Sequence, residues 1–512
     1  MKQNIFNLAL VLVTLFLGVV VMPQTQAQAS PGIIYVPDDY PTIQGAVDAA
    51  SPGDTIIVRD GDYTENIIVT KDHLTIKSEN GAGSTIVDMA NSGKGVFEVR
   101  ADYVSLIGFT VNGAAGEYQA GIYLTESSYC NIRDNTAIGN YYGICLEDSG
   151  NNAVTNNTVK WNSQDGILLG ISSNNTVTNN TANENHYFGI RVYFSGSNTL
   201  RNNSMSHNRC NFYSWGWALS ELRQDVDISN KVDGRPIYYL VDKPNQVIDS
   251  STNAGYVAVV NSTNITVKDL TLTHSGFGVL FAYTNNSRIE NITGCYDKHS
   301  FLLYHSNNNM VINNFAGSNI YDGFRIWSSN NNTFINNTSN WNSYGAYLDS
   351  SDNNVLINNT ASNSSEWGIC SRNSNNNTIY LNNVLNGTLG NVLSALSTNI
   401  WNSTEKLTYA YNGTNYTGYL GNYWSDYESK YPDAGEIGSA GIWDIPYSIR
   451  VTDHAVPQAD DCPLLAPVSR YLLTENLTGA APSWLSRYWW TIVVGVMIVV
   501  LLVYFLWWRK RA

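Results

Sequence analysis

The chain has 512 residues and a formal net charge of −14, with 42 acidic and 28 basic residues. This balance argues against a nucleic-acid partner, because phosphate contacts need clustered positive charge. Only 14% of the residues are charged, whereas Tyr and Trp number 33 and 14. A surface of Asn, Ser, Thr and aromatic residues fits an extracellular protein that faces glycans. It fits equally a solenoid with asparagine ladders.

Targeting segments are predicted at both ends of the chain. An apolar run, Ile5–Met22, precedes the small-residue site Ala27-Gln28-Ala29, which predicts that residues 1–29 are a secretory signal peptide. Residues 488–508 carry no charge and are long enough to cross a hydrocarbon core. Because the basic tail, residues 509–512, should stay cytoplasmic, we expect a single-pass protein of the cell membrane with its body outside.

Residues 30–100 are expected to form an N-terminal cap and the first coils. Ile43, Ala46, Val47 and Ala50 are apolar at helical spacing, directly after Pro41-Thr42. They predict a short helix that covers the open end of a stack of strands.

A nine-residue phrase recurs in residues 101–211, with starts 22, 23 and 23 residues apart: Ile132–Asn140, Val154–Asn162, Val177–Asn185 and Leu200–Asn208. This period, without a helical pattern inside it, predicts a solenoid of short strands. Strand alternation directs one set of side chains into the core: Ile122, Leu124, Ile144, Leu146, Ile167, Leu169, Ile190 and Val192. The residues between them should face outward: Tyr123, Cys145, Leu168 and Arg191.

The pattern breaks at residues 212–246 and resumes over residues 247–390. Roughly a dozen coils are expected, and because stacked strands lie about 4.8 Å apart they would make a rod on the order of 60 Å long. Paired asparagines recur at the turns, where Asn tolerates left-handed backbone and forms side-chain ladders. A closing cap is expected at residues 391–470 and a short stalk at 471–487.

The repeats resemble right-handed parallel β-helix proteins of the pectin-lyase-like class, and the chain looks most like NosD-type proteins. The residues that carry this resemblance are Asn230–Leu240, Ala254–Val257, Gly421–Tyr427, Asp444–Tyr447 and Asp461–Leu464. The resemblance implies an all-β exported solenoid, to which the sequence adds a helical cap and a C-terminal transmembrane helix. It also implies carbohydrate binding or copper-site assembly.

Two departures from that family pattern stand out. The family's cap usually carries a run of Asp and Gly that could hold calcium, whereas residues 431–441 keep only Asp433 and Glu436. The membrane anchor is an addition to the family pattern, which weakens the expectation of a soluble periplasmic accessory protein.

Aromatic columns are the first candidate site. Tyr193, Tyr304 and Trp327 share one position in their coils, and Phe194 and Tyr283 follow it by one. These columns would lie side by side if the break is looped out. Flat rings along a groove hold sugar faces, so they predict binding of cell-surface or extracellular glycans. Ordinary packing between coils is the alternative.

Carboxylates are the second candidate site. Glu126 and Asp148 are 22 residues apart and should be stacked neighbours, with Glu147 beside them. Such a group could serve acid–base glycoside cleavage or bind Ca²⁺. A solvated acidic edge is the simpler interpretation.

Soft ligands are the third candidate. Met205, His207 and Cys210 offer a thioether, an imidazole and a thiol, which suit copper. Incidental turn residues are the alternative, because metal sites need several converging ligands. None of the six cysteines lies in a CxxC pair, and their scatter indicates no disulfide framework.

Glycosylation sequons are frequent, as at Asn156, Asn179, Asn202, Asn264, Asn291, Asn336, Asn358, Asn402, Asn412 and Asn415. Taken together, the sequence predicts a membrane-anchored extracytoplasmic β-helix that binds or presents at the cell surface, with glycan as the leading ligand. A NosD-like copper accessory protein and a polysaccharide lyase or glycoside hydrolase are the alternatives.

Overall fold

A computed structural model describes residues 31–91, 93, 95–452 and 456–474. The predicted signal peptide, the predicted transmembrane helix and most of the predicted stalk lie outside these residues. No helix within the described ranges is both long and apolar enough to cross a membrane.

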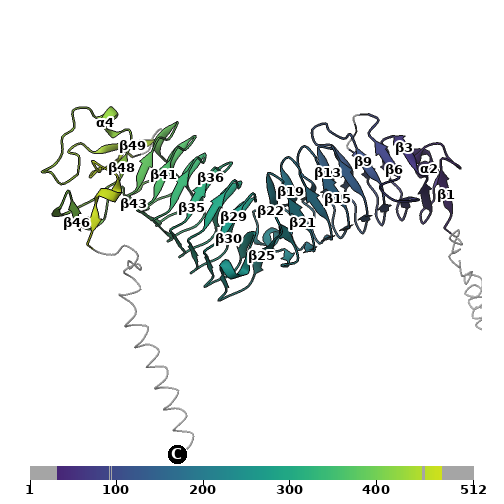
Figure 1. The fold of residues 1–512 in the computed structure, drawn as a ribbon, viewed down its shortest axis with the longest axis horizontal. Helices are drawn as coiled ribbons and strands as arrows, with labels where there is room; N and C mark the ends of the chain where they lie inside the picture. The colour runs from purple at the N-terminus through teal and green to yellow at the C-terminus, as the bar shows by residue number, and fades with distance from the viewer. Residues whose placement is uncertain (1–30, 92, 94, 453–455, 475–512) are drawn as a thin grey trace, which may run out of the picture.

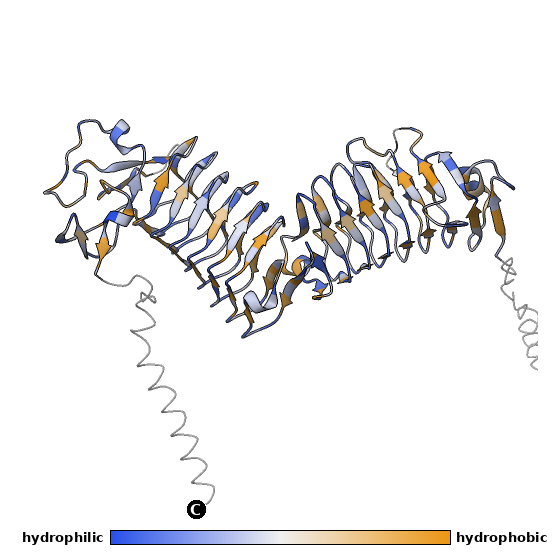
Figure 2. Cartoon of the chain, in the orientation of Figure 1, coloured by the Kyte–Doolittle hydropathy of each residue, from blue (hydrophilic) through white to orange (hydrophobic). Residues whose placement is uncertain are grey.

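The described chain forms two straight arms of stacked coils that meet at an angle, which we call the elbow (Figure 1). Apolar residues recur in coil after coil along both arms (Figure 2). The arms contain about 16 coils, more than the dozen expected.

The predicted N-terminal helix is confirmed as α2 (Ile43–Ala49). The Thr42 hydroxyl caps it by accepting a hydrogen bond from the Gly45 amide at 3.1 Å. Ile43, Ala46 and Val47 are buried, as their spacing predicted. The helix therefore covers the end of the first arm.

Each coil of the first arm contributes one strand to each of three parallel sheets. The first sheet contains β1 (Ile33–Val36), β2 (Thr55–Val58), β5 (Thr75–Ser78), β8 (Ser105–Ile107), β11 (Asn131–Arg133), β14 (Ala153–Thr155), β17 (Thr176–Thr178), β20 (Thr199–Arg201) and β23 (Asp225–Val226). The second contains β4 (Ile67–Val69), β7 (Gly95–Val99), β10 (Ala120–Thr125), β13 (Tyr142–Glu147), β16 (Ile167–Gly170), β19 (Phe188–Tyr193) and β22 (Cys210–Trp215). The third contains β3 (Gly61–Thr64), β6 (Thr85–Asp88), β9 (Thr110–Asn112), β12 (Thr136–Ile138), β15 (Thr158–Lys160), β18 (Thr181–Asn183), β21 (Ser204–Ser206) and β24 (Lys231–Val232).

The predicted inward column of the second sheet is confirmed. Ile122, Ile144, Ile167 and Ile190 pair in register and are fully buried. The outward residues do not all meet solvent, because Tyr123 and Cys145 are 6% and 4% exposed in a small apolar cluster on the outer face.

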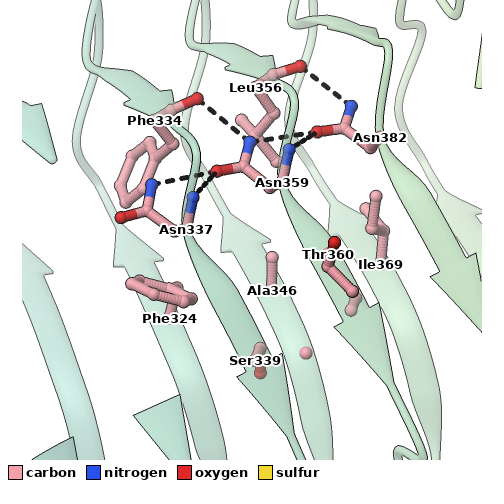
Figure 3. Close-up of a pocket in the computed structure, with 12 residues that line it drawn as sticks. Phe324, Phe334, Asn337, Ser339, Ala346, Leu356, Asn359, Thr360, Ile369 and Asn382 are labelled. Carbon is pink, nitrogen blue, oxygen red and sulfur yellow. Dashed lines mark hydrogen bonds between the residues drawn. The ribbon is translucent and has the colours of Figure 1, made fainter. Parts of the chain in front are cut away.

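Asparagine ladders fill the turns, as the paired asparagines predicted. The side-chain oxygen of Asn359 accepts the backbone amide of Asn337 at 2.9 Å, and its Nδ2 donates to the Phe334 carbonyl at 3.0 Å (Figure 3). Beside this ladder, small side chains leave an interior hollow of about 20 Å³. That volume is close to the minimum for one water molecule, so this hollow is no ligand site.

The second arm repeats the three-sheet plan. Its first sheet contains β25 (Arg235–Val241), β27 (Tyr256–Val260), β30 (Phe277–Ala282), β33 (His299–Tyr304), β36 (Asp322–Trp327), β39 (Tyr344–Asp349), β42 (Trp367–Arg372) and β45 (Gly390–Ala395). Its second contains β26 (Val247–Ile248), β28 (Thr266–Lys268), β31 (Arg288–Glu290), β34 (Met310–Ile312), β37 (Thr333–Ile335), β40 (Val355–Ile357) and β43 (Thr378–Tyr380). Its third contains β29 (Thr271–Thr273), β32 (Thr293–Cys295), β35 (Phe315–Gly317), β38 (Thr338–Asn340), β41 (Thr360–Ser362), β44 (Asn383–Leu385) and β48 (Tyr423–Trp424).

The elbow forms where the chain reverses between the two stacks. Strand β24 pairs antiparallel with β25 around Gly234, whose φ of +76° is left-handed. The predicted break therefore contains the last coil of the first arm, α3 (Leu219–Leu222), the reversal and the start of the second arm, with η1 (Ser250–Thr252) following. It is not looped out of the stack, which corrects that expectation.

Packing at the elbow joins the inside of one arm to the outside of the other. Ala258 and Leu280 face outward on β27 and β30, yet both are fully buried in the core cluster that contains Ile190 and Phe212 of the first arm. The second arm keeps a separate interior core around residues such as Val257 and Phe281. Its outer face thus closes the open end of the first arm.

The closing cap covers the far end of the second arm. It contains β46 (Leu407–Tyr411), β47 (Thr414–Gly418), α4 (Tyr427–Lys430), β49 (Tyr447–Val451), β50 (Gln458–Asp460), η2 (Val468–Arg470) and β51 (Leu472–Leu473). Because β51 pairs with β46, the cap continues to Leu473, past residue 471, where the stalk was predicted to begin.

Candidate functional site

A hollow of about 250 Å³ lies at the elbow and is lined by residues of both arms. Its aromatic lining is Tyr193, Tyr213, Trp215, Trp217, Phe277 and Trp327, and its other lining residues are Lys298, His299, Leu302 and Arg325. No carboxylate is among these lining residues.

The turn that follows β22 brings Trp217 to the hollow. The Glu221 carboxylate accepts the backbone amides of Trp217 and Ala218 at 2.8 and 3.0 Å. The Tyr304 hydroxyl, from the second arm, donates to the Trp217 carbonyl at 2.8 Å. These bonds satisfy the turn's polar groups and fix the indole between the arms.

The aromatic rings form two walls that meet across the elbow. Trp215 of the first arm stacks on Trp327 of the second, with ring centroids 5.9 Å apart. Trp217 meets Trp327 edge-on at 4.9 Å. Trp217 is 50% exposed, so a flat ring face stays open to a ligand. Such an arrangement can take the apolar face of a flat ligand ring.

Lys298 supplies an ammonium group to the hollow. Its Nζ lies 4.6 Å from the centroid of the Tyr213 ring and donates to the Tyr213 hydroxyl at 3.3 Å. Burial, followed by the nearby Arg191 guanidinium, lowers the pKa of Lys298 to about 8. Lys298 forms no ion pair with any carboxylate of the described chain.

Two arginines and a histidine flank the lysine, and buried or partly buried carboxylates pair with them. Arg191 pairs with Asp165 at 3.3 Å, and Arg325 pairs with Asp349 at 3.1 Å. Burial raises the pKa of Asp165 to about 6. His299 lies 3.0 Å from Asp322, and burial lowers its pKa, so the imidazole is neutral at pH 7.

Of the predicted aromatic residues, Tyr193 and Trp327 both line the hollow. Tyr304 is 4% exposed and contacts Trp215 at 4.9 Å from behind the wall. Phe194 packs on Trp217 at 6.1 Å, and Tyr283 stacks on His305 at 4.9 Å, away from the lining. The columns face each other across the elbow and are not adjacent coils, because β22 continues the first stack.

Sequence reasoning missed Tyr213, Trp215, Trp217, Lys298 and Arg325. The aromatic run from Phe212 to Trp217, placed at the break in the repeat, was the available signal. Nothing in the sequence placed Lys298 beside Tyr213, which lies 85 residues earlier.

The predicted carboxylates lie on the outer edge of the first arm. Thr125 pairs with Glu147, which places Glu126 beside Asp148 as predicted. Glu126, Glu147 and Asp148 are all exposed, and Glu147 accepts a hydrogen bond from the Tyr123 hydroxyl. Glu126 also lines a second hollow of about 390 Å³ with Glu98, Arg100, Tyr123 and Thr125.

The predicted soft ligands differ sharply in exposure. Met205 and Cys210 are fully buried in the apolar core of the first arm, whereas His207 is exposed on a turn with φ +56°. Burial raises the pKa of the Cys210 thiol to about 12. This arrangement adds no support to copper binding at these three residues.

The three-sheet coils and the helical cap define a right-handed parallel β-helix. The chain belongs to the NosD family, because the sequence model of the family described as "Periplasmic copper-binding protein (NosD)" matches residues 47–221 and 221–429.

One curated relative and several solved structures are also similar. A cell surface glycoprotein of Methanothermus fervidus is 37% identical over 99 residues, which is 19% of this chain and only 15% of that protein. The A-module of mannuronan C-5 epimerase AlgE4 of Azotobacter vinelandii is 14% identical, with a TM-score of 0.32, over 71% of this chain and 93% of its own. Pectate lyase Pel9A is 16% identical, with a TM-score of 0.32, over 73% and 78%. Such distant likeness says nothing about activity.

The family description implies copper, and the described residues do not fit it. They contain no group of three or more His, Cys, Asp or Glu that could hold a metal ion. Burial raises the pKa of the Cys130 and Cys462 thiols to about 11 and that of Cys370 to about 12, which opposes the thiolate form that binds copper.

Proposed function

We propose that this chain is an extracytoplasmic surface β-helix that binds carbohydrate in the elbow hollow. The observation that carries the proposal is the pair of aromatic walls, contributed by different arms, around a hollow with hydrogen-bond donors. Ring faces stack on the apolar faces of sugars, and a few donors fix their orientation. The similarity to a cell surface glycoprotein supports the location.

The size and the chemistry of the hollow indicate binding without cleavage. A volume of about 250 Å³ falls below the range of about 300–1,000 Å³ typical of drug-sized ligands, so the hollow suits one or two sugar rings of a chain. The lining offers no carboxylate to act as a general acid or nucleophile.

A glycan array probed with the full-length chain tests the binding proposal. Trp217→Ala removes the exposed wall and should weaken binding about tenfold to a hundredfold, since stacking on one aromatic ring contributes on the order of 1–3 kcal/mol. Trp341→Ala is the control, because Trp341 is similarly exposed, at 63%, but lies outside the hollow. An affinity that is unchanged in Trp217→Ala would refute the site. Release of reducing ends from a bound glycan would refute the non-catalytic role.

We also propose that residues 488–508 anchor the protein in the membrane, with the body outside. The uncharged segment and its basic tail support this orientation. Protease added to intact cells should remove the β-helix body and leave the C-terminal tail protected. Protection of the body would contradict the orientation.

A further inference from the structure

Lys298 is a charged group of the elbow that has no oppositely charged contact within the described chain. The flanking Arg191 and Arg325 pair with Asp165 and Asp349, whereas Lys298 pairs with no carboxylate of the described chain. A partly buried ammonium with no carboxylate in contact is costly: burial and the Arg191 guanidinium lower the pKa of Lys298 to about 8, against the opposing effect of the more distant Asp165. Hydrogen bonding to the neutral Tyr213 hydroxyl does not neutralise the charge.

The surroundings of Lys298 leave room for an anion. The hollow is lined by Lys298 and Arg325 and by no acid, although the whole chain carries a net charge of −14. Asp165 and Asp322 are almost fully buried, at 0% and 2% exposed, so they lie behind the arginines and not at the opening.

The position of the cations beside aromatic rings favours a sugar acid over a simple inorganic anion as the ligand. The cations adjoin the aromatic walls: Arg325 lies 5.0 Å from the Trp327 ring centroid, and Arg191 lies 4.5 Å from that of Tyr193. A ligand that carries both a flat apolar face and a carboxylate can use both features at once.

We infer that the elbow binds an acidic saccharide, a uronic acid residue, whose ring stacks on Trp217 beside the Trp327 ring and whose carboxylate pairs with Lys298. This inference rests on the carbohydrate binding proposed above and specifies its ligand class. The ligand carboxylate would be the counter-ion of Lys298, which has none in contact within the described chain, and Arg325 would donate further hydrogen bonds to it.

Methyl esters of uronates provide a matched test, because they keep the ring and remove the charge. Calorimetry with the full-length chain would compare short oligomers of galacturonate, mannuronate and glucuronate with their methyl esters. At least one acid should bind about tenfold or more tighter than its ester, as expected for loss of a charge-assisted contact. No preference for any acid over its ester would overturn the inference.

Two lysine variants test whether Lys298 causes the preference for the acid over the ester. Lys298→Met keeps the length of the side chain, removes the buried charge, and should bind acid and ester equally. Lys160→Met is the control, because the Lys160 ammonium also lies over an aromatic ring, Trp161 at 4.3 Å, but away from the hollow. Lys160→Met should keep the full preference for the acid. An acid preference that persists in Lys298→Met would place the anion elsewhere and overturn the inference.

The outcomes separate this inference from the proposed function. If esters and neutral glycans bind as well as acids, and Trp217→Ala weakens binding, the elbow binds carbohydrate but does not select acidic saccharides. If no saccharide binds, the carbohydrate proposal and the acidic-saccharide inference are both wrong. A thermal melt of each variant, monitored by circular dichroism, confirms that it is folded.

Discussion

Lys298 shows how a single residue can be held in an unfavourable state by its surroundings. Its charged form is disfavoured because it is buried beside Arg191, and the described groups that also face it are Asp165, Cys210, Tyr213, Tyr321 and Arg325. Burial raises the pKa of Asp165 to about 6, and that of Cys210 to about 12. Lys298 is therefore the group of this set that changes charge between pH 7 and pH 9.

The pH dependence of binding follows from this titration. Because the free protein loses the Lys298 proton as pH rises through about 8, an acidic saccharide should bind about tenfold more weakly at pH 9 than at pH 7. Titrating the saccharide at pH 7, 8 and 9 at constant ionic strength measures the slope. Lys298→Met should show no such slope. A wild-type affinity that stays flat would contradict pairing between Lys298 and the ligand.

The sequence identified part of this site and could not identify the rest. The positions of Tyr193 and Trp327 could be predicted, because strand alternation places outward side chains at fixed positions of each coil. The positions of Lys298 and Trp217 could not be predicted, because their contacts depend on how the arms are joined at the elbow. A repeat pattern predicts neighbours within a stack and contains no information about a contact between two stacks.

The asparagine ladder is the element that sets the register of the coils. At the turn Asn179-Asn180 the first residue is left-handed and exposed, with φ +58°, and the second is buried. Asn180 is 1% exposed; it accepts the Asn157 amide at 2.9 Å and donates to the Val154 carbonyl at 2.8 Å. The ladder thus satisfies backbone groups that the strands leave free at the corners.

Replacing a ladder asparagine should therefore cost far more than replacing its neighbour. Asn180→Ala leaves the Asn157 amide and the Val154 carbonyl unsatisfied in the core, with an expected loss of about 2–4 kcal/mol. Thermal unfolding measures it as a lowered Tm. Asn179→Gly is the matched control, because glycine keeps the left-handed backbone at an exposed position. Equal melting of the two variants would show that the ladder is not a stabilising element.

The family motifs of the closing cap form one hydrogen-bonded element. Asp460 is fully buried; it accepts the Asn422 amide at 2.7 Å, the Trp424 indole N–H at 2.9 Å and the Cys462 amide at 3.1 Å. A Cβ on Gly421 would lie 1.8 Å from the Asp460 carboxylate, so only glycine fits there. The motif residues that identify the family here therefore close the stack.

Asp460→Ala should accordingly destabilise the cap by about 2–4 kcal/mol, because three buried donors lose their acceptor. The adjacent exposed Asp461, changed to Ala, is the control and should change stability little. Hydrogen exchange should show faster exchange in residues 407–473 of the Asp460 variant. Uniform protection in both variants would indicate that the cap is held by other contacts.

The shape of the whole molecule depends on the way that the two cores meet. The sequence predicted a β-helix with one interruption, and the structure confirms the coils. What it could not predict is that the interruption turns the second stack so that its outer face closes the first. Outward positions near the elbow are small or apolar, as at Ala258, Leu280 and Leu302, while the same column carries Arg325 and Tyr347 further along. This change within one column marks the part of the second arm that the first arm covers.

That column provides a test of the elbow that leaves the coils intact. Arginine is tolerated at this register, since Arg325 occupies it, so Leu280→Arg should be acceptable to the second arm alone. It would nevertheless bury a charge in the core cluster of the first arm, because Leu280 is fully buried there.

We expect Leu280→Arg to separate the arms at the elbow. Small-angle X-ray scattering should show a changed maximum dimension, while the far-ultraviolet circular dichroism spectrum should keep its β signature. Ligand binding should be lost at the same time, because the hollow needs both arms. Leu393→Arg, in the same column two coils beyond Tyr347, should leave scattering and binding unchanged. If Leu280→Arg scattered like the wild type and bound saccharide normally, the elbow would not be a packed junction.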